Sequence, residues 1–127
     1  MANILVCDDE KDIVSALRIY LQAEGYEIYE AFNGEEAVEV MKRQEIHLVL
    51  MDIMMPVMDG YQALVGIRNM EKERGIPEDK AVKVIMTTAL NEEKNVKMAF
   101  ELGCTIYSGK PIDQERFDQA LKKLGLI

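Results

Sequence analysis

Acidic side chains directly follow two short apolar stretches of the chain. Asp8 and Asp9 come after residues 4–7, and Asp52 comes after the unbroken apolar run of residues 48–51. If both stretches are parallel strands of one sheet, their carboxyl ends share an edge and the carboxylates gather there. Carboxylates held together repel one another, and a hard cation such as Mg²⁺ relieves that repulsion while keeping several waters. The pattern therefore predicts an acidic magnesium pocket.

A pocket of this kind can accept a phosphoryl group on one of its own carboxylates. Asp52 is the candidate nucleophile, because an aspartate that attacks a phosphoryl donor forms an acyl phosphate. Thr87 follows the apolar run of residues 82–86, and Lys110 lies just past residues 104–107. The threonine hydroxyl could donate to a phosphoryl oxygen, and the lysine ammonium could neutralise its charge. We predict a phosphoryl-accepting site built from successive strand ends.

Each of these residues also has an ordinary structural role open to it. Asp8 or Asp9 could cap the first helix, and Asp52 could accept amides in a turn. Thr87 could be a β-branched strand residue and Lys110 a surface lysine. The shared placement at successive strand ends favours one functional site over these separate roles.

The elements that position these residues alternate along the chain. Apolar runs predict five strands, at residues 4–7, 26–32, 48–51, 82–86 and 104–107. After each strand, apolar residues recur at helical spacing, and polar caps mark four helix starts: Asn33, Asp59 with Gln62, Asn91 and Asp113. Alternation of this kind predicts an α/β fold, a doubly wound five-stranded parallel sheet with five helices on its two faces.

Further expectations concern individual positions. The fourth helix should turn Val96, Ala99 and Phe100 toward the core. Residues 71–74 carry four charges in succession and should form a solvated helix end rather than a binding patch. His47 opens the central strand far from the acidic edge, so we expect a structural or surface role for it.

The composition is that of one globular domain of 127 residues, 49% hydrophobic and 30% charged. A formal charge of −8 argues against direct binding to nucleic acid or to an anionic membrane. The apolar runs are too short to span a bilayer and the first residues do not form a signal peptide, so we expect a cytoplasmic protein with no membrane association. Cys7 and Cys104 lie singly in apolar runs, which indicates buried thiols in a reducing compartment.

Taken together, these motifs resemble the receiver domain of bacterial response regulators, the CheY-like domain of two-component systems. The resemblance covers essentially the whole chain and rests on four segments: Asp8-Asp9, residues 50–60 around Asp52, Thr87-Thr88-Ala89 and residues 107–111. It implies a flavodoxin/CheY-like sheet with the strand order 2-1-3-4-5.

The resemblance also implies a phosphoacceptor and a metal site. Asp52 would accept phosphate from the phosphohistidine of a sensor histidine kinase or of a histidine phosphotransfer protein. Asp9, Asp52 and the Met54 backbone carbonyl would hold Mg²⁺, or Mn²⁺ in its place, with Asp8 acting through water.

Phosphate recognition and switching would fall to later motif residues. Lys110 would bind the phosphate, and Thr87 and Tyr107 would form the switch pair. The peptide bond before Pro111 would be cis, which the small trans preference of such bonds makes feasible.

The output would be a protein contact. A downstream protein would dock on the surface around the fourth helix, the fifth strand and the fifth helix, which carries Tyr107. The motifs and helices fill residues 3–125, so we expect residues 1–127 to be a single stand-alone receiver with no effector domain. A receiver fragment of a longer transcriptional regulator and a degenerate docking scaffold are the alternatives. Met54 and Ala89 would flank the hydrolytic water without binding it, which predicts slow self-dephosphorylation.

Two other classes of protein use a similar sheet edge. A haloacid-dehalogenase-like phosphatase would carry a second aspartate two residues after the nucleophile, where this chain has Met54. A flavodoxin-type FMN module would need a Ser/Thr/Gly-rich phosphate loop where Asp8-Asp9-Glu10 stands, and these charges would repel a phosphate. We therefore expect a signalling domain that assists its own phosphorylation and dephosphorylation, and not an enzyme.

Overall fold

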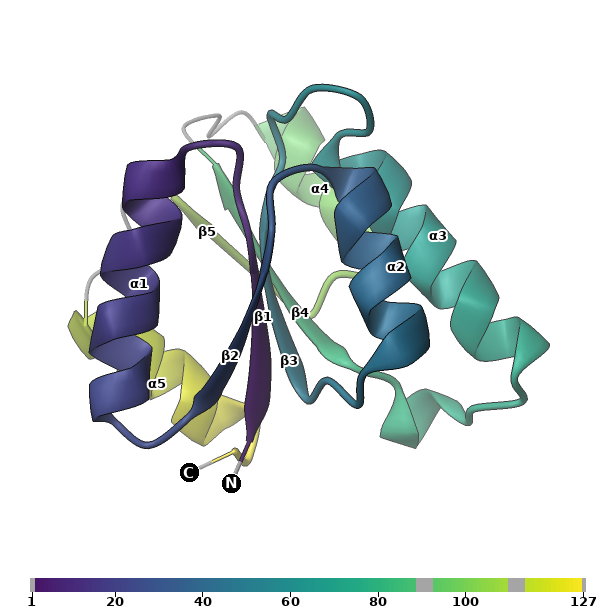
Figure 1. Cartoon of the computed structure of the whole chain (residues 1–127). Helices are drawn as coiled ribbons and strands as arrows, with labels where there is room; N and C mark the ends of the chain where they lie inside the picture. The colour runs from purple at the N-terminus through teal and green to yellow at the C-terminus, as the bar shows by residue number, and fades with distance from the viewer. Residues whose placement is uncertain (1, 89–92, 110–113, 127) are drawn as a thin grey trace.

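The computed structural model of this chain describes residues 2–88, 93–109 and 114–126. Its strands are β1 (Asn3–Cys7), β2 (Glu27–Ala31), β3 (Leu48–Asp52), β4 (Lys83–Thr88) and β5 (Ile106–Gly109). Its helices are α1 (Lys11–Ala23), α2 (Gly34–Arg43), α3 (Gly60–Glu73), the short 3-10 helix η1 (Glu78–Lys80), α4 (Glu93–Glu101) and α5 (Gln114–Lys123). The strands form one parallel sheet in the order β2-β1-β3-β4-β5, so the predicted fold class and strand order are confirmed (Figure 1).

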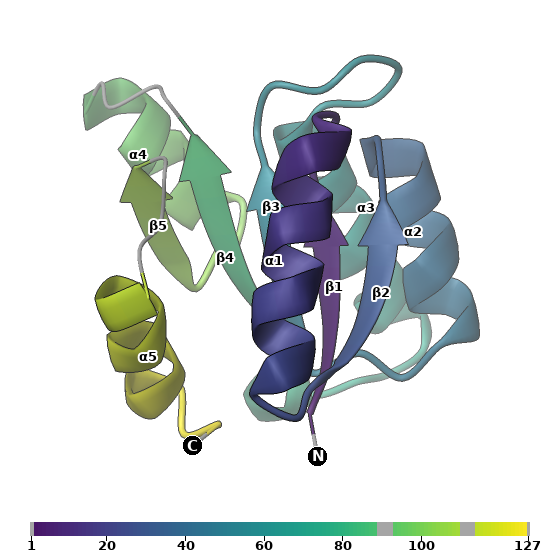
Figure 2. The same ribbon diagram turned by 60° about the vertical axis from the view of Figure 1, so that its left-hand side comes forward.

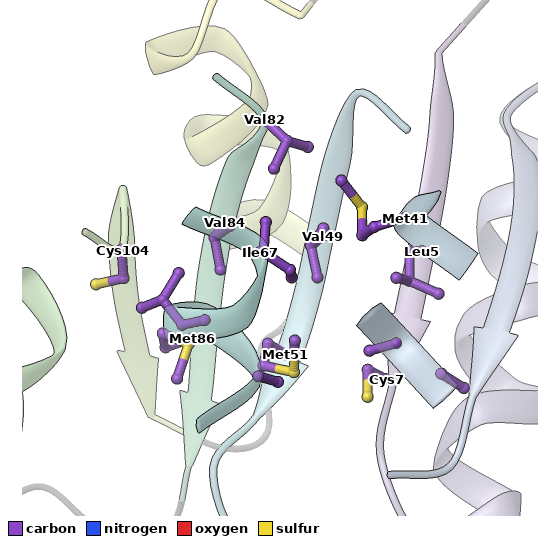
Figure 3. Packing of buried hydrophobic residues seen from close by; sticks show 14 of the residues in the cluster. Leu5, Cys7, Met41, Val49, Met51, Ile67, Val82, Val84, Met86 and Cys104 are labelled. Atoms are coloured by element: carbon purple, nitrogen blue, oxygen red, sulfur yellow. The ribbon is translucent and has the colours of Figure 1, made fainter. Parts of the chain in front are cut away.

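Helices cover both faces of the sheet. Figures 1 and 2 show α1 and α5 on one face and α2, α3 and α4 on the other. Successive strand residues point to opposite faces, so each strand supplies apolar side chains to two core clusters. Figure 3 shows the cluster under α2, α3 and α4, with Leu5, Val49 and Val84 side by side on three strands. Burial on both faces explains why the central strands are unbroken apolar runs. Across the described ranges, no helix combines the length and the apolar character needed to cross a membrane.

Two helices start at their predicted caps. The Asn33 side chain accepts a hydrogen bond of 2.9 Å from the Glu36 N–H at the start of α2. Asp59 and Gln62 form a reciprocal capping box at the start of α3, with bonds of 2.9 and 3.0 Å. The other two predicted caps lie outside the described residues: Asn91 and Asp113.

The fifth strand starts later than predicted, at Ile106 rather than at Cys104. The reason is the way α4 ends. Gly103 has a φ of +102°, and the Cys104 N–H donates to the Ala99 carbonyl at 3.0 Å. This is a Schellman turn, so Cys104 still belongs to the helix end and not to the strand.

The predicted inward position of Phe100 is wrong. Its side chain is 48% exposed, whereas the neighbouring Ala99 is fully buried. Successive residues of a helix point about 100° apart, so a helix that packs the small Ala99 against the sheet turns the next side chain outward. The exposed face of α4 therefore carries an aromatic ring.

Glu71 also departs from its prediction. It is 5% exposed instead of lying on a solvated helix end, although residues 72–74 are exposed as predicted. Glu71 comes one turn after the fully buried Ile67, and its carboxylate lies 2.7 Å from the Arg68 guanidinium. The ion pair is what allows a carboxylate on the inner stripe of α3.

His47 lies at the amino end of the sheet. Its ring Nδ1 accepts a hydrogen bond of 2.9 Å from the Asn3 N–H, and its backbone N–H donates to the Asn3 carbonyl at 2.9 Å. The imidazole therefore joins the start of β1 to the residue before β3, which is a structural role.

Candidate functional site

The candidate site lies at the carboxyl edge of the sheet. Asp52 is the last residue of β3, and its Cα partner on β4 is Thr87. The last pair between β1 and β3 joins Cys7 to Met51, so Asp8 and Asp52 are the next residues along two neighbouring strands. Each of these two aspartates is only 3% exposed. Two buried acids therefore lie at the ends of neighbouring strands on this edge.

The thiol of Cys7 responds to the charge collected at this edge. Burial raises the pKa of Cys7, and the carboxylates of Asp8, Asp52, Glu36 and Asp9 raise it further, in that order. Charges act strongly on a buried group only at short range. The acids that follow β1, end β3 and start α2 therefore all add to the negative charge that the Cys7 thiol experiences.

The same edge offers hard oxygen ligands for a divalent cation. Asp8, Asp9 and Glu10 each place a carboxylate oxygen within 4.8 Å of the other two, with Asp8 buried and the others exposed. The Glu10 N–H donates to the Asp8 carboxylate at 3.0 Å, which fixes this loop. Mg²⁺ prefers carboxylate and carbonyl oxygens, so these residues fit a magnesium ion. Sequence reasoning omitted Glu10 from the site, although its place beside Asp9 was the available signal.

The segment that follows Asp52 forms another wall. Met54 is 63% exposed, while Met55 is buried and its sulfur accepts a hydrogen bond of 3.4 Å from the Cys7 thiol. Val57 is 76% exposed and has a φ of +68°, a conformation that β-branched residues rarely adopt. The segment is therefore held against the core by the buried Met55, while the Met54 side chain is open to solvent.

Two glycines let this segment approach its neighbours closely. A Cβ atom on Gly60 would lie 2.3 Å from the Asp52 carbonyl oxygen, and one on Gly34 would lie 2.6 Å from that of Met58. The Gly60 N–H donates to the Ile53 carbonyl at 2.9 Å, and the Gly34 N–H donates to Met58 at 2.8 Å. A close approach between segments distant in sequence leaves no local pattern, so neither of these glycine contacts could be predicted from the sequence.

The predicted switch pair occupies neighbouring strands. Thr87 is 8% exposed, and its hydroxyl donates to the Met51 carbonyl at the long distance of 3.5 Å. Tyr107 is half-buried, and its Cα partner on β4 is Met86, the residue before Thr87. Burial raises the pKa of the Tyr107 phenol, so it stays protonated and able to donate.

The remaining predicted site residues fall on segments without described structure. These are Ala89, Lys110 and Pro111, and with them the predicted cis peptide bond. Their motif positions are those that follow β4 and β5 in the sequence.

Comparisons with known proteins agree with this arrangement. Residues 4–122 match the family model of the response regulator receiver domain. The transcriptional regulatory protein SrrA of Staphylococcus aureus is 38% identical over 125 residues, which are 98% of this chain and 48% of that protein. The chain thus spans about half the length of the curated relatives it matches.

Two solved structures show the same fold. The CheX–CheY–BeF₃–Mg²⁺ complex of Borrelia burgdorferi matches with a TM-score of 0.85 and 32% identity, covering 98% of this chain and 89% of that chain. The co-crystal structure of the Saccharomyces cerevisiae phosphotransfer protein Ypd1 with the receiver domain of Ssk1 matches with a TM-score of 0.90 and 28% identity, covering 98% and 89%. With its five-stranded fold, its acidic edge and the family match over residues 4–122, the chain belongs to the response regulator receiver domains of two-component systems.

Proposed function

We propose that this receiver domain accepts a phosphoryl group on Asp52 from a phosphohistidine. The observation that carries the proposal is the buried Asp52 carboxylate at the end of β3, in register with Thr87 and beside Asp8. In the transfer, the bond between nitrogen and phosphorus breaks and an Asp52 oxygen forms the new bond to phosphorus. The electron pair stays on the donor imidazole, which takes up a proton. The product on Asp52 is an acyl phosphate.

A divalent cation would complete the site. Asp9, Asp52 and the Met54 backbone carbonyl would hold Mg²⁺, with Asp8 acting through water, and Mn²⁺ could take its place. The ion would supply charge neutralisation for the phosphoryl oxygens. The oxygen cluster of Asp8, Asp9 and Glu10 supports this assignment because it concentrates hard ligands just after β1, the strand that pairs with the one ending at Asp52.

The other motif residues would recognise the phosphoryl group and transmit its presence. Lys110 would pair with a phosphoryl oxygen. The Thr87 hydroxyl would donate to another, and its long bond to Met51, 3.5 Å, is a weak one to give up. Tyr107 would then change its position on β5, since it lies beside the strand that carries Thr87.

Two protein partners follow from this function. The donor would be a sensor histidine kinase or a histidine phosphotransfer protein, in keeping with the Ypd1–Ssk1 structure. The downstream partner would bind the surface of α4, β5 and α5. Phe100, 48% exposed on α4, supports that choice, because exposed aromatic rings are common anchors of protein interfaces.

The test is phosphorylation by a small phosphodonor in Mg²⁺, read by mass spectrometry of the intact protein. Wild type should gain one phosphoryl group, and Asp52→Asn should gain none. Asp12→Asn is a matched control, because it makes the same chemical change at an exposed acid of α1 and should label like wild type. Labelling of the Asp52→Asn protein, or no labelling of wild type, would contradict the proposal; the second result would favour a docking scaffold.

A further inference from the structure

A buried ion pair lies at the opposite end of the sheet from the acidic edge. Arg68 and Glu71 are one turn apart on α3, with side chains 19% and 6% exposed, and their charged groups lie 2.7 Å apart. Both partners also bind the backbone at Val82, just before β4. The Arg68 guanidinium donates to the Val82 carbonyl at 2.9 Å, and the Val82 N–H donates to Glu71 at 2.7 Å.

The same guanidinium holds the carboxyl end of α4. Its Nε and Nη2 atoms donate to the Gly103 carbonyl at 3.1 and 2.7 Å. Gly103 follows α4 in the Schellman turn, so a cation lies at the negative end of the helix dipole. A Cβ atom on Gly103 would lie 3.1 Å from Arg68 Nε, and the φ of +102° also favours glycine there. Arg68 therefore fixes the end of α4 through two bonds in a fork geometry that lysine cannot reproduce.

The start of β5 is fixed next to it. The Thr105 N–H donates to the Val84 carbonyl at 2.8 Å, and the Thr105 hydroxyl accepts from the Val84 N–H at 3.0 Å. The ion pair on α3 thus joins the residue just before β4 to the glycine just after α4, while β4 itself holds the residue just before β5. Thr87 and Tyr107 lie further along these two strands, toward the acidic edge.

We infer that the Arg68–Glu71 pair is the pivot of the switch: it holds the carboxyl end of α4 in place, and the amino end of α4 moves when the domain is phosphorylated. This inference rests on the proposed function, since it needs a signal that starts at Asp52. A helix held at its carboxyl end can follow a change at the acidic edge only by moving its amino end. The first turn of α4 has a contact suited to such a movement, a bond of 3.3 Å from the Tyr61 hydroxyl to the Asn95 carbonyl. This bond is only partly buried, and its hydroxyl and carbonyl can exchange it for bonds to water when the helix end moves.

The test is amide NMR of the wild-type chain with and without Mg²⁺ and BeF₃⁻, a phosphoryl mimic. We expect the amides of Asp52, Thr87 and residues 93–96 to shift, while Val82 and Gly103 stay within the range of distant control amides and keep their hydrogen-exchange protection. Equal shifts at Val82 or Gly103 and at residues 93–96 would overturn the pivot alone. No shift at Asp52 or Thr87 would overturn the proposed function, and the pivot with it.

Variants test the pivot independently. Arg68→Lys keeps the charge and loses the fork, so the BeF₃⁻ shifts should spread to Gly103 and shrink by at least twofold at residues 93–96, with Asp52 still responding. Lys97→Gln is the control, because it removes an exposed pair with Glu101 on α4 itself, 4.0 Å long, and should behave as wild type. An Arg68→Lys pattern identical to wild type would overturn the role of the pair. If Arg68→Lys does not fold, Glu71→Gln, which retains an oxygen for Val82, takes its place with the same two outcomes.

Discussion

Asp52 and Thr87 are Cα partners across β3 and β4, so the sheet itself holds the candidate phosphoacceptor opposite the hydroxyl that would sense it. A parallel pair of central strands is a rigid spacer, because its backbone bonds are buried on both faces. The response of Thr87 to phosphorylation can then be a rotation of one side chain, with no shift of the backbone between the two residues.

Replacing Thr87 should separate phosphorylation from switching. We expect Thr87→Ala to gain the phosphoryl group at a rate within about threefold of wild type while the ring signals of Tyr107 no longer change, since one hydroxyl bond is lost. Thr87→Ser keeps the hydroxyl and should restore the change. Mass spectrometry measures the rate of phosphorylation, and NMR of the tyrosine rings measures the response of Tyr107. A Tyr107 response in Thr87→Ala equal to wild type would show that the signal takes another route.

The lifetime of the phosphorylated form should depend on two side chains. Met54, two residues after Asp52 and 63% exposed, can cover a phosphoryl group with apolar bulk and offers a water no hydrogen bond. Ala89 is equally unable to bind one. Introducing Met54→Asn with Ala89→Glu should therefore speed hydrolysis, by on the order of tenfold if positioning of the water is what limits it. Decay would be followed in Mg²⁺ after removal of the phosphodonor; an unchanged or slower decay would contradict the explanation.

Two glycines of α3 offer a matched comparison. A Cβ atom on Gly60 would meet the backbone of Asp52 and Ile53 at 2.3 and 2.8 Å, which cannot give way without moving the site. We expect Gly60→Ala to cost about 1–3 kcal/mol of stability and to impair labelling of Asp52. A Cβ atom on Gly66 would meet no backbone, only a Val38 methyl group at 3.2 Å, and Gly66→Ala gains helix propensity, so the stability of this variant should change by less than about 1 kcal/mol. Urea unfolding measures both; equal effects would refute the steric account.

The buried carboxylate of Glu71 should dominate the stability of α3. Removing it in Glu71→Ala leaves the Arg68 charge and the Val82 N–H without their partner, so we expect a loss of about 3–5 kcal/mol. Glu73→Ala deletes an exposed carboxylate two residues on and should change stability by no more than about 0.5 kcal/mol. Chemical unfolding of the two variants side by side provides the measurement, and a small effect of Glu71→Ala would show that the pair contributes little.

Stability should fall in alkaline solution, in part because of Cys104. Burial raises the pKa of this thiol from 9.0 to about 11, with Arg68 acting in the opposite direction. The folded state therefore holds the proton more tightly than the unfolded state. This contribution is complete below pH 9.0 and is lost as the pH rises through about 11. The unfolding free energy of Cys104→Ala, although lower overall, should decline less steeply over that range; a parallel decline would assign the effect to other groups.

Local patterns predicted the parts of this molecule that depend on neighbours in sequence. The apolar run before Asp52 predicts a buried strand, and the Asp59–Gln62 spacing predicts a capped helix start; the structure has both. Phe100 was misplaced because periodicity alone does not say which of two adjacent apolar residues has room against the sheet. The Ala99 side chain is small enough to pack against the sheet, and the Phe100 ring is not.

Long-range contacts could not be predicted in the same way. Gly103 approaches Arg68 from 35 residues away, and nothing near either residue indicates that contact. For Glu71 a weak signal existed: it continues the inner stripe of Leu64 and Ile67 at helical spacing. The charged residues that follow Glu71 mask this signal, and the cation that makes the burial of Glu71 possible, Arg68, lies one turn back.

The hydrogen bonds made by His47 also indicate whether a phosphoryl group would be attached to a nitrogen or to a carboxylate oxygen of this chain. A ring whose Nδ1 lone pair is occupied by the Asn3 N–H is a poor nucleophile, and it sits at the amino end of the strands. The chain has one histidine, so no other imidazole competes with the carboxylates for a phosphoryl donor. A captured phosphoryl group would then have the reactivity of a mixed anhydride: hydroxylamine would release it and leave a hydroxamate behind, marking the residue that had carried it.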